Sequence, residues 1–196
     1  MAAATSIVEV AGLKADEAIV VQNSNNLALR LRPCDVFARV AHAGREVARF
    51  EVELAQRLAE AEAPSAALDP RCAPRVHERD GFVVTLWTYY DQLGGAVPPV
   101  DYASALLRLH AGMRRVGITA PHYTDRVAEA ERLVASREAS PALAEADREH
   151  LGNALRSLRR AVGGRRAAEQ LLHGEPYPGN VLRTENGPVF IDLETC

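Results

Sequence analysis

Hydrophobic positions in the first half of the chain alternate as in short β-strands, with one helical stretch among them. In EAIVVQNSNNLALRL, two apolar runs flank a polar cluster at residues 22–26, which is typical of a β-hairpin. DVFARVA predicts a third strand. REVARFEVELAQRLAEAEAP has helical spacing and ends before Pro64, and GFVVTLWTYY predicts another strand. This order predicts a small α+β unit.

After Asp101 the pattern changes to longer amphipathic helices. DYASALLRLHAGMRR opens with Asp101 as a candidate N-cap. TDRVAEAERLVAS and PALAEADREHLGNALRSLRRAV continue the helical pattern until the glycines at 163–164. AEQLLHG and GPVFIDLE predict two short strands that flank a polar loop. We therefore expect an N-terminal domain at residues 1–88 and a helical domain at residues 89–196, with a hinge near residues 87–99.

Composition and charge exclude several classes of protein. A net charge of −3 gives no general attraction to nucleic acid or to an anionic membrane. The first 21 residues have no cationic region, and charged residues interrupt their apolar runs, so we expect no targeting or membrane-spanning segment and a cytoplasmic location. Cys34, Cys72 and Cys196 are widely spaced and lack nearby histidine pairs, which predicts free thiols. A monomer and a homodimer are both compatible with the sequence.

The segment LLHGEPYPGNVL, residues 171–182, concentrates an acid, an amide and turn-forming residues between apolar runs. A β-hairpin through TENG would return Asp192 to the vicinity of Asn180. Amide and carboxylate oxygens meeting there are the hard ligands that magnesium prefers. Glu175, on the same loop, could orient a hydroxyl and take its proton. An ordinary surface turn is the alternative, because Pro, Gly and Asn are frequent in turns.

HGEPYPGN followed by FID resembles the catalytic loop and metal-binding segment of the aminoglycoside phosphotransferase family, whose usual form is H-G-D-x-x-x-x-N followed by I-D. This resemblance implies an α+β, protein-kinase-like two-lobed fold with a small β-rich N-lobe and a helical C-lobe. It also implies ATP- and Mg-dependent transfer of the γ-phosphoryl group to a hydroxyl of a small molecule. In this family, Glu175 would be the catalytic acid/base and His173 would brace the loop. Asn180 and Asp192 would be the magnesium ligands.

The resemblance extends to the phosphate-binding part of the first half. Arg39, in VFARVA, stands where the family has a strand lysine that contacts the nucleotide phosphates. Glu51 is its expected ion-pair partner and Glu53 is the alternative. The short segment NSNN, with Ser24 and Asn25, stands where these enzymes fold a loop over the phosphates.

Two further segments match the family pattern. VVTLWTYY would be the hinge whose backbone around Trp87 and Tyr89 meets the adenine. LLRLHAG resembles the helix that follows this hinge, and we interpret His110 as a packing or hydrogen-bonding residue without a catalytic role.

Three departures from the family pattern favour a second interpretation. Glu175 replaces an aspartate and Arg39 replaces a lysine, whose compact ammonium differs from the planar guanidinium fork. The chain stops at Cys196, whereas family members continue with helices that cover the acceptor pocket, so we expect a C-terminally truncated helical lobe. The alternative is therefore a catalytically weak or inactive nucleotide-binding module, similar to a pseudokinase. A partially folded fragment is the third possibility.

Overall fold

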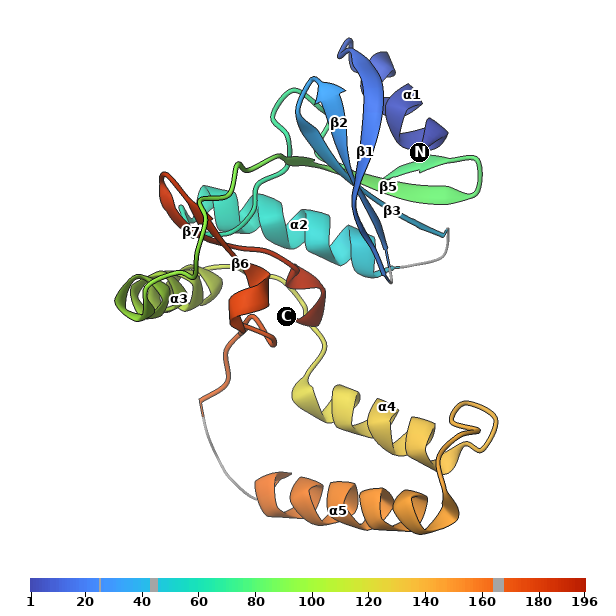
Figure 1. Ribbon diagram of the computed structural model, residues 1–196. Coiled ribbons are helices and arrows are strands. Elements are labelled where there is room, and N and C mark those ends of the chain that lie inside the picture. The colour runs from blue at the N-terminus through green and yellow to red at the C-terminus, as the bar shows by residue number, and fades with distance from the viewer. Residues whose placement is uncertain (25, 43–45, 164–167) are drawn as a thin grey trace. The chain divides into compact units, whose positions relative to one another are not determined.

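The computed structural model describes residues 1–24, 26–42, 46–163 and 168–196 (Figure 1). They form two compact units, Met1–Ile118 with Leu171–Cys196, and Thr119–Gln170. The predicted domain boundary at residue 88 stays a prediction. In chain order, the elements are α1 (Ala2–Val10), β1 (Ala15–Asn23), β2 (Leu27–Pro33), β3 (Val36–His42), α2 (Val47–Glu60), β4 (His77–Arg79), β5 (Phe82–Thr88), α3 (Pro99–Met113), α4 (Tyr123–Ala135), α5 (Glu145–Gly163), η1 (Pro178–Asn180), β6 (Val181–Thr184), β7 (Gly187–Phe190) and η2 (Leu193–Thr195), where η denotes a short 3₁₀ helix.

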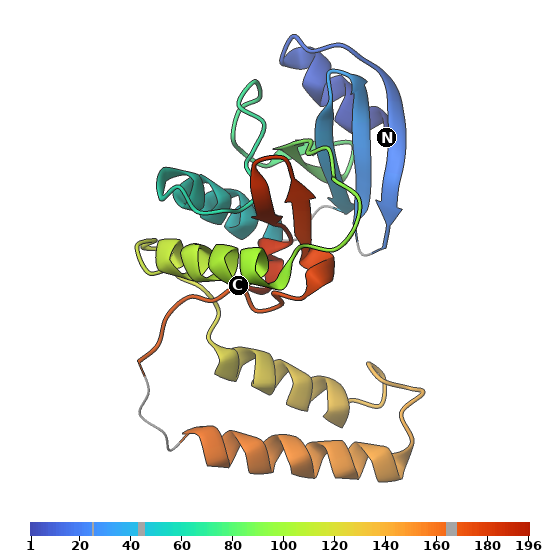
Figure 2. The same ribbon diagram turned by 60° about the vertical axis from the view of Figure 1, so that its left-hand side comes forward.

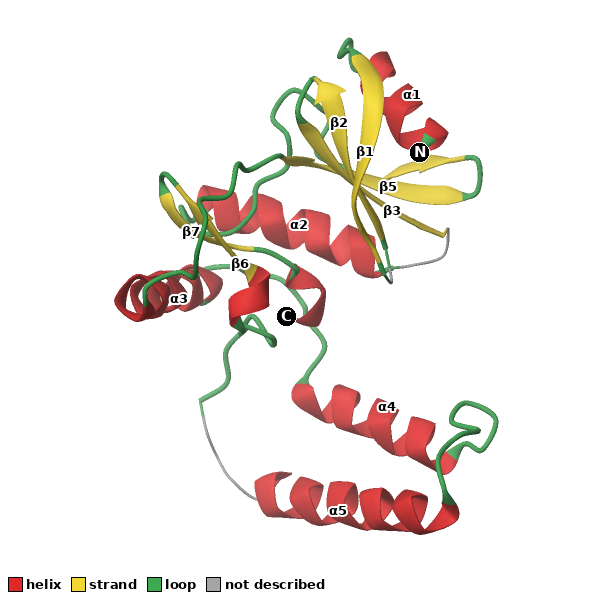
Figure 3. Cartoon of the chain, viewed as in Figure 1, coloured by secondary structure: helices red, strands yellow, loops and turns green. Residues whose placement is uncertain are grey.

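The first unit contains an antiparallel five-stranded sheet in the order β1-β2-β3-β5-β4 (Figure 3). Val36, Ala38 and Val40 of β3 are buried in the core on one face of this sheet. Because side chains alternate along a strand, Arg39 projects from the opposite face. The strands and helices predicted for the first half are therefore present, and the α+β class is confirmed.

Helix α1 is an element that the sequence reasoning missed. Ala3, Ala4, Ile7 and Val8 are buried, and they belong to the same hydrophobic core as the inward face of the sheet. Their spacing repeats every four residues, which places them on one face of a helix. The sequence reasoning considered this segment only as a possible targeting signal.

A second core joins α2, α3 and the β6–β7 hairpin. Its buried members include Leu54 and Leu58 of α2, Leu109 of α3 and Phe190 of β7. Figure 2 shows the hairpin beside α3, with which β7 is in contact. The three cysteines are free thiols, as predicted.

Two local predictions about this region were wrong. Asp101 lies in the first turn of α3 and is not its N-cap, because the helix begins earlier, at Pro99, and proline suits the first helical position. AEQLLHG contains no strand in its described residues, 168–174. The backbone N–H of His173 donates to the side chain of His110 at 3.4 Å, so it makes no sheet ladder.

The second unit is a hairpin of α4 and α5, which pack against each other. Arg148 of α5 is buried and donates to Ser140 Oγ at 2.9 Å and to Ser140 O at 2.9 Å. It also donates to the carbonyls of Val134, Ser136 and Leu143, so one side chain holds the connection between the helices. No helix among the residues described is long and apolar enough to cross a membrane.

Candidate active site

His173 anchors the start of the polar loop. Its side chain is fully buried, and Nε2–H donates to the carbonyl oxygen of Ile191 at 2.9 Å. Thr195 Oγ1 donates to the carbonyl of His173 at 3.1 Å, and the backbone N–H of His173 donates to His110 Nε2. Burial lowers the pKa of His173. The histidine is therefore neutral at pH 7 and ties the loop both to α3 and to the segment that follows β7.

Gly174 lets the loop approach that segment closely. Its φ is +81°, and a Cβ atom on Gly174 would lie 2.2 Å from the carbonyl oxygen of Thr195. Any side chain at this position would collide with a backbone atom and require a left-handed conformation that L-residues disfavour. Gly174 thus allows the loop that carries Glu175 to pack directly against η2.

The β6–β7 hairpin brings Asn180 and Asp192 to the same place, as the spacing predicts. Val181 pairs with Phe190, and the backbone N–H of Ile191 donates to the carbonyl of Asn180 at 3.0 Å. Asn180 is buried, and its Nδ2 donates to the carbonyl of Glu175 at 3.1 Å. Its Oδ1 accepts no hydrogen bond from the described residues. Asp192 has a left-handed φ of 65° and begins the turn into η2.

Arg39 connects the sheet, α2 and the segment after β7. Its Nη1 donates to Glu51 Oε1 at 2.6 Å, and its Nη2 donates to Asp192 Oδ1 at 3.3 Å and to Glu194 Oε2 at 3.4 Å. Of the two glutamates considered as partners, Glu51 is the one that accepts from Arg39. Glu53 is exposed and lies 3.8 Å from Arg57.

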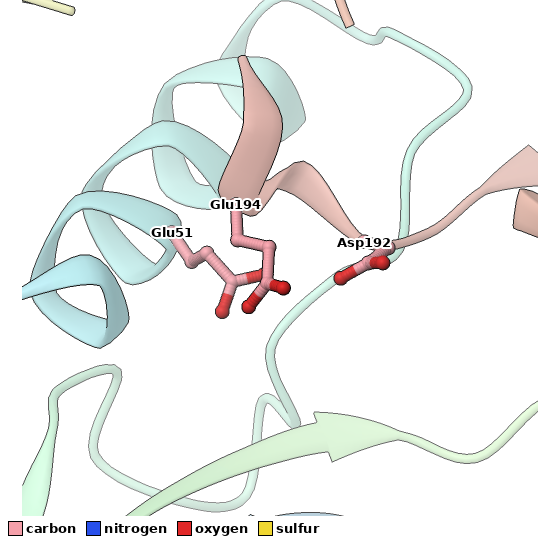
Figure 4. A group of neighbouring side chains, drawn as sticks. All are labelled: Glu51, Asp192 and Glu194. Atoms are coloured by element: carbon pink, nitrogen blue, oxygen red, sulfur yellow. The ribbon is translucent and has the colours of Figure 1, made fainter. Parts of the chain in front are cut away.

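Glu51, Asp192 and Glu194 form a cluster of carboxylates around this guanidinium, which we call the acidic cluster (Figure 4). One oxygen of each lies within 4.8 Å of the others. Burial raises the pKa of Glu51 to about 7, although Arg39 acts in the opposite direction. Sequence reasoning missed Glu194. The only sequence signal for Glu194 was its position two residues after Asp192. The turn through η2 brings its carboxylate close to those of Glu51 and Asp192.

A cleft of about 1000 Å³ opens beside these groups. Four of the expected nucleotide-binding residues line it, namely Ser24, Arg39, Trp87 and Tyr89, together with both expected metal ligands, Asn180 and Asp192. Glu51, His173 and Glu175 are not among the lining residues. Glu175 is exposed on the loop, and Asn25 lies outside the described residues.

Side-chain contacts fix the hinge end of this cleft. Trp87 is buried, and its Nε1–H donates to Thr85 Oγ1 at 2.8 Å. The guanidinium carbon of Arg30 lies 3.9 Å from the centre of the Tyr89 ring, within cation–π distance. The backbone N–H of Thr88 donates to the carbonyl of Ala67 at 3.0 Å. These contacts fix the end of β5 and the residue that follows it.

Several solved structures resemble this chain. An aminoglycoside phosphotransferase from Streptomyces rimosus is 21% identical, with a TM-score of 0.59, and the match covers 99% of this chain and 76% of the other. A spectinomycin phosphotransferase in complex with ADP and spectinomycin is 12% identical, with a TM-score of 0.61 and coverages of 98% and 68%. A microcompartment-associated aminopropanol kinase is 15% identical, with a TM-score of 0.66 and coverages of 97% and 69%. These matches confirm the predicted kinase-like fold.

No curated protein sequence matches the chain. The model of the phosphotransferase enzyme family matches residues 19–196, which include the sheet, the hinge, the polar loop and the segment after β7. This match covers most of the chain and all the residues that meet at the cleft. The chain belongs to the phosphotransferase enzyme family.

Proposed function

We propose that this chain binds ATP with magnesium and transfers the γ-phosphoryl group to a hydroxyl of a small molecule. The observation that carries this proposal is the convergence of Arg39, Asn180 and Asp192 on the wall of one cleft. Arg39 lies on β3, far in the sequence from Asn180 and Asp192, which the β6–β7 hairpin brings together. Their side chains provide one cation and two types of hard oxygen donor, which together suit a nucleotide phosphate and its metal.

The nucleotide would lie in the cleft between the hinge and the sheet. A volume of about 1000 Å³ is enough for a nucleotide with part of an acceptor. We assign the adenine to the backbone around Trp87 and Tyr89, and the phosphates to Arg39 and to the loop that contains Ser24 and Asn25. Glu51 would hold the guanidinium of Arg39 in place through the 2.6 Å contact.

The side chains near the phosphates fit a magnesium ion. Asn180 and Asp192 are the proposed ligands, and Glu194 adds a third hard donor close to Asp192. The three carboxylates of the acidic cluster face the guanidinium of Arg39, so acidic groups predominate among the described residues at this position. A bound magnesium ion supplies charge neutralisation and orientation of the phosphate oxygens.

Glu175 is the proposed group that receives the acceptor. Its carboxylate would orient the hydroxyl and take its proton as the oxygen–phosphorus bond forms and the bond from the γ-phosphorus to the leaving oxygen of ADP breaks. His173, Gly174 and the contact from Asn180 to the carbonyl of Glu175 hold the backbone of this residue. Correct placement matters, because a displacement of about 1 Å can reduce a rate about a hundredfold.

A nucleotide-binding module without turnover is the second candidate. It is favoured by the exposed position of Glu175, which does not line the cleft, and by the replacement of the family's aspartate with glutamate. Both candidates bind ATP, and only the first transfers a phosphoryl group.

The test is a thermal shift measurement with ATP, with and without magnesium, followed by a screen of hydroxyl compounds for ADP release. The proposal expects magnesium-dependent stabilisation by ATP and at least one acceptor that accelerates ADP formation. Stabilisation without turnover for any acceptor supports the second candidate. The absence of any ATP-dependent stabilisation contradicts both.

A further inference from the structure

The guanidinium of Arg39 occupies the centre of the acidic cluster. Nη1 is used by Glu51, while Nη2 lies between Asp192 Oδ1 at 3.3 Å and Glu194 Oε2 at 3.4 Å. Figure 4 shows Glu51 and Glu194 side by side, with Asp192 pointing toward them. Asp192 and Glu194 thus share one cation, the guanidinium of Arg39.

Arginine is suited to this arrangement in a way that lysine is not. The planar fork presents two nitrogens in fixed directions, so one faces α2 while the other faces the segment after β7. A lysine ammonium is a single point charge and would have to share its position among the three acids. The side chain of Arg39 is 18% exposed, so water screens these ion pairs only in part.

We propose that Arg39 is the counter-ion of Asp192 and Glu194 in the nucleotide-free protein, and that it leaves them for the nucleotide phosphates when a divalent metal binds. This inference rests on the proposed function. It describes how the binding of the divalent metal is coupled to the binding of the nucleotide. A metal ion that binds alone must displace the guanidinium of Arg39. A nucleotide that binds alone draws Arg39 away from Asp192 and Glu194 and brings its phosphates toward these carboxylates. When both are present, the metal replaces Arg39 beside the carboxylates and Arg39 pairs with the phosphates, so Arg39 makes the binding of metal and nucleotide mutually favourable.

The experiment measures the affinity of the nucleotide-free full chain for Mn²⁺ by calorimetry, and its affinity for ADP with and without Mn²⁺. The variants are Arg39→Met, which keeps an unbranched apolar stem and removes the charge, and Arg39→Met with Glu51→Gln, which avoids leaving a buried carboxylate unpaired. Arg49→Met is the matched control, because Arg49 lies on α2, the helix that carries Glu51, but pairs with Glu78 at an exposed position, 3.2 Å away. Asp192→Asn reports whether Mn²⁺ binds at the acidic cluster.

We expect ADP and Mn²⁺ to strengthen each other's binding to the wild-type chain by about 5- to 150-fold, the usual range of coupling between two sites. Both Arg39 variants should bind Mn²⁺ alone at least about tenfold more tightly than wild type, and should lose most of the coupling to ADP. Arg49→Met should behave as wild type. Equal Mn²⁺ affinities in wild type and both Arg39 variants would overturn the inference.

The Asp192→Asn variant distinguishes a failure of this inference from a failure of the proposed function. If it weakens Mn²⁺ binding while the Arg39 variants leave it unchanged, the metal site stands and only the role of Arg39 as counter-ion is wrong. If Asp192→Asn leaves Mn²⁺ binding unchanged, or if no variant binds Mn²⁺, both the metal assignment and the inference are contradicted.

Discussion

The Nε2 atom of His173 lies 2.9 Å from the carbonyl oxygen of Ile191, the residue that precedes Asp192. This hydrogen bond joins the first residue of the polar loop to the segment that carries Asp192 and Glu194. One buried imidazole therefore fixes the loop of Glu175 relative to the proposed metal ligands. The separation between Glu175, the proposed acceptor-binding group, and the proposed phosphate-binding groups depends on it.

Replacing His173 should destabilise the protein and disturb the site together. His173→Leu leaves the carbonyl of Ile191 without its donor, which should cost about 1–3 kcal/mol of unfolding free energy. His173→Gln retains an N–H donor and should cost less. Urea unfolding measures both, with the exposed His150→Gln as a control that should stay within about 0.5 kcal/mol of wild type. Equal stability of His173→Leu and wild type would contradict this contact.

Two histidines, the buried His173 and the half-buried His110, should destabilise the chain on acidification. Burial lowers the pKa of His173 and of His110 below the ordinary value of 6.5, and for His110 the neighbouring His173 and Arg114 act in the same direction. The folded state then binds fewer protons than the unfolded state just below 6.5. The stability that these two histidines contribute is therefore present above this pH and is lost as the pH falls below it. Glu51 acts in the opposite direction, because burial raises its pKa to about 7.

Urea unfolding at a series of pH values from about 7.5 to about 5 measures this loss. The double variant His110→Gln with His173→Gln should lose less stability than wild type as the pH falls over this range. His77, whose pKa burial also lowers, and Glu51, whose pKa burial raises, still titrate in both proteins. Identical slopes for the two proteins would show that these histidines do not titrate differently on folding.

Alanine substitutions at two glycines distinguish the cost of backbone strain from the cost of a steric collision. Gly12 and Gly174 have nearly the same φ, +80° and +81°, but a Cβ on Gly12 meets nothing within 4 Å, whereas one on Gly174 lies 2.2 Å from Thr195 O. Gly12→Ala should cost about 1 kcal/mol, from the left-handed conformation alone. Gly174→Ala should cost clearly more in denaturant unfolding and should also reduce turnover. Equal costs would mean that the close approach of the loop to η2 is not maintained in solution.

Periodicity predicts most of the strands and helices of this fold, and it bears on the choice between Glu51 and Glu53, which the resemblance left open. Val47, Glu51, Leu54 and Leu58 recur at helical spacing, so Glu51 interrupts an apolar face of α2, and a buried carboxylate requires a partner. Glu53 lies outside this stripe. The hairpin that returns Asp192 to Asn180 is also predictable, because its turn residues and apolar runs lie close together in the sequence.

Other features depend on contacts that local patterns do not contain. Glu194 reaches the acidic cluster because Asp192 adopts a left-handed conformation and η2 follows, and nothing in the letters IDLETC requires that turn. AEQLLHG has the apolar character of a strand, but the side chain of the half-buried His110 accepts the N–H of His173. In both places, the backbone conformation is set by tertiary contacts.

Asp192→Asn tests the proposed metal ligand. The substitution keeps the shape of the side chain and removes one negative charge next to Asn180, so we expect the magnesium-dependent part of ATP binding to be lost while the thermal unfolding temperature without ligand changes little. Calorimetry of ATP binding with and without magnesium measures this. Glu185→Gln removes one charge from the exposed turn of the same hairpin and should leave the magnesium dependence intact. An unchanged magnesium dependence in Asp192→Asn would remove this assignment.

Phosphoryl transfer by wild type and by Glu175→Gln, measured with the same acceptor and alongside the ATP affinity of both proteins, tests the central claim most directly. Glutamine keeps the size of the side chain but cannot take the proton of the hydroxyl. Because the contribution of a general base is about a hundred- to ten-thousandfold, we predict a loss of turnover of that order with an ATP affinity close to that of wild type. Equal rates of phosphoryl transfer in the two proteins would contradict the claim that this loop positions Glu175 to receive the acceptor.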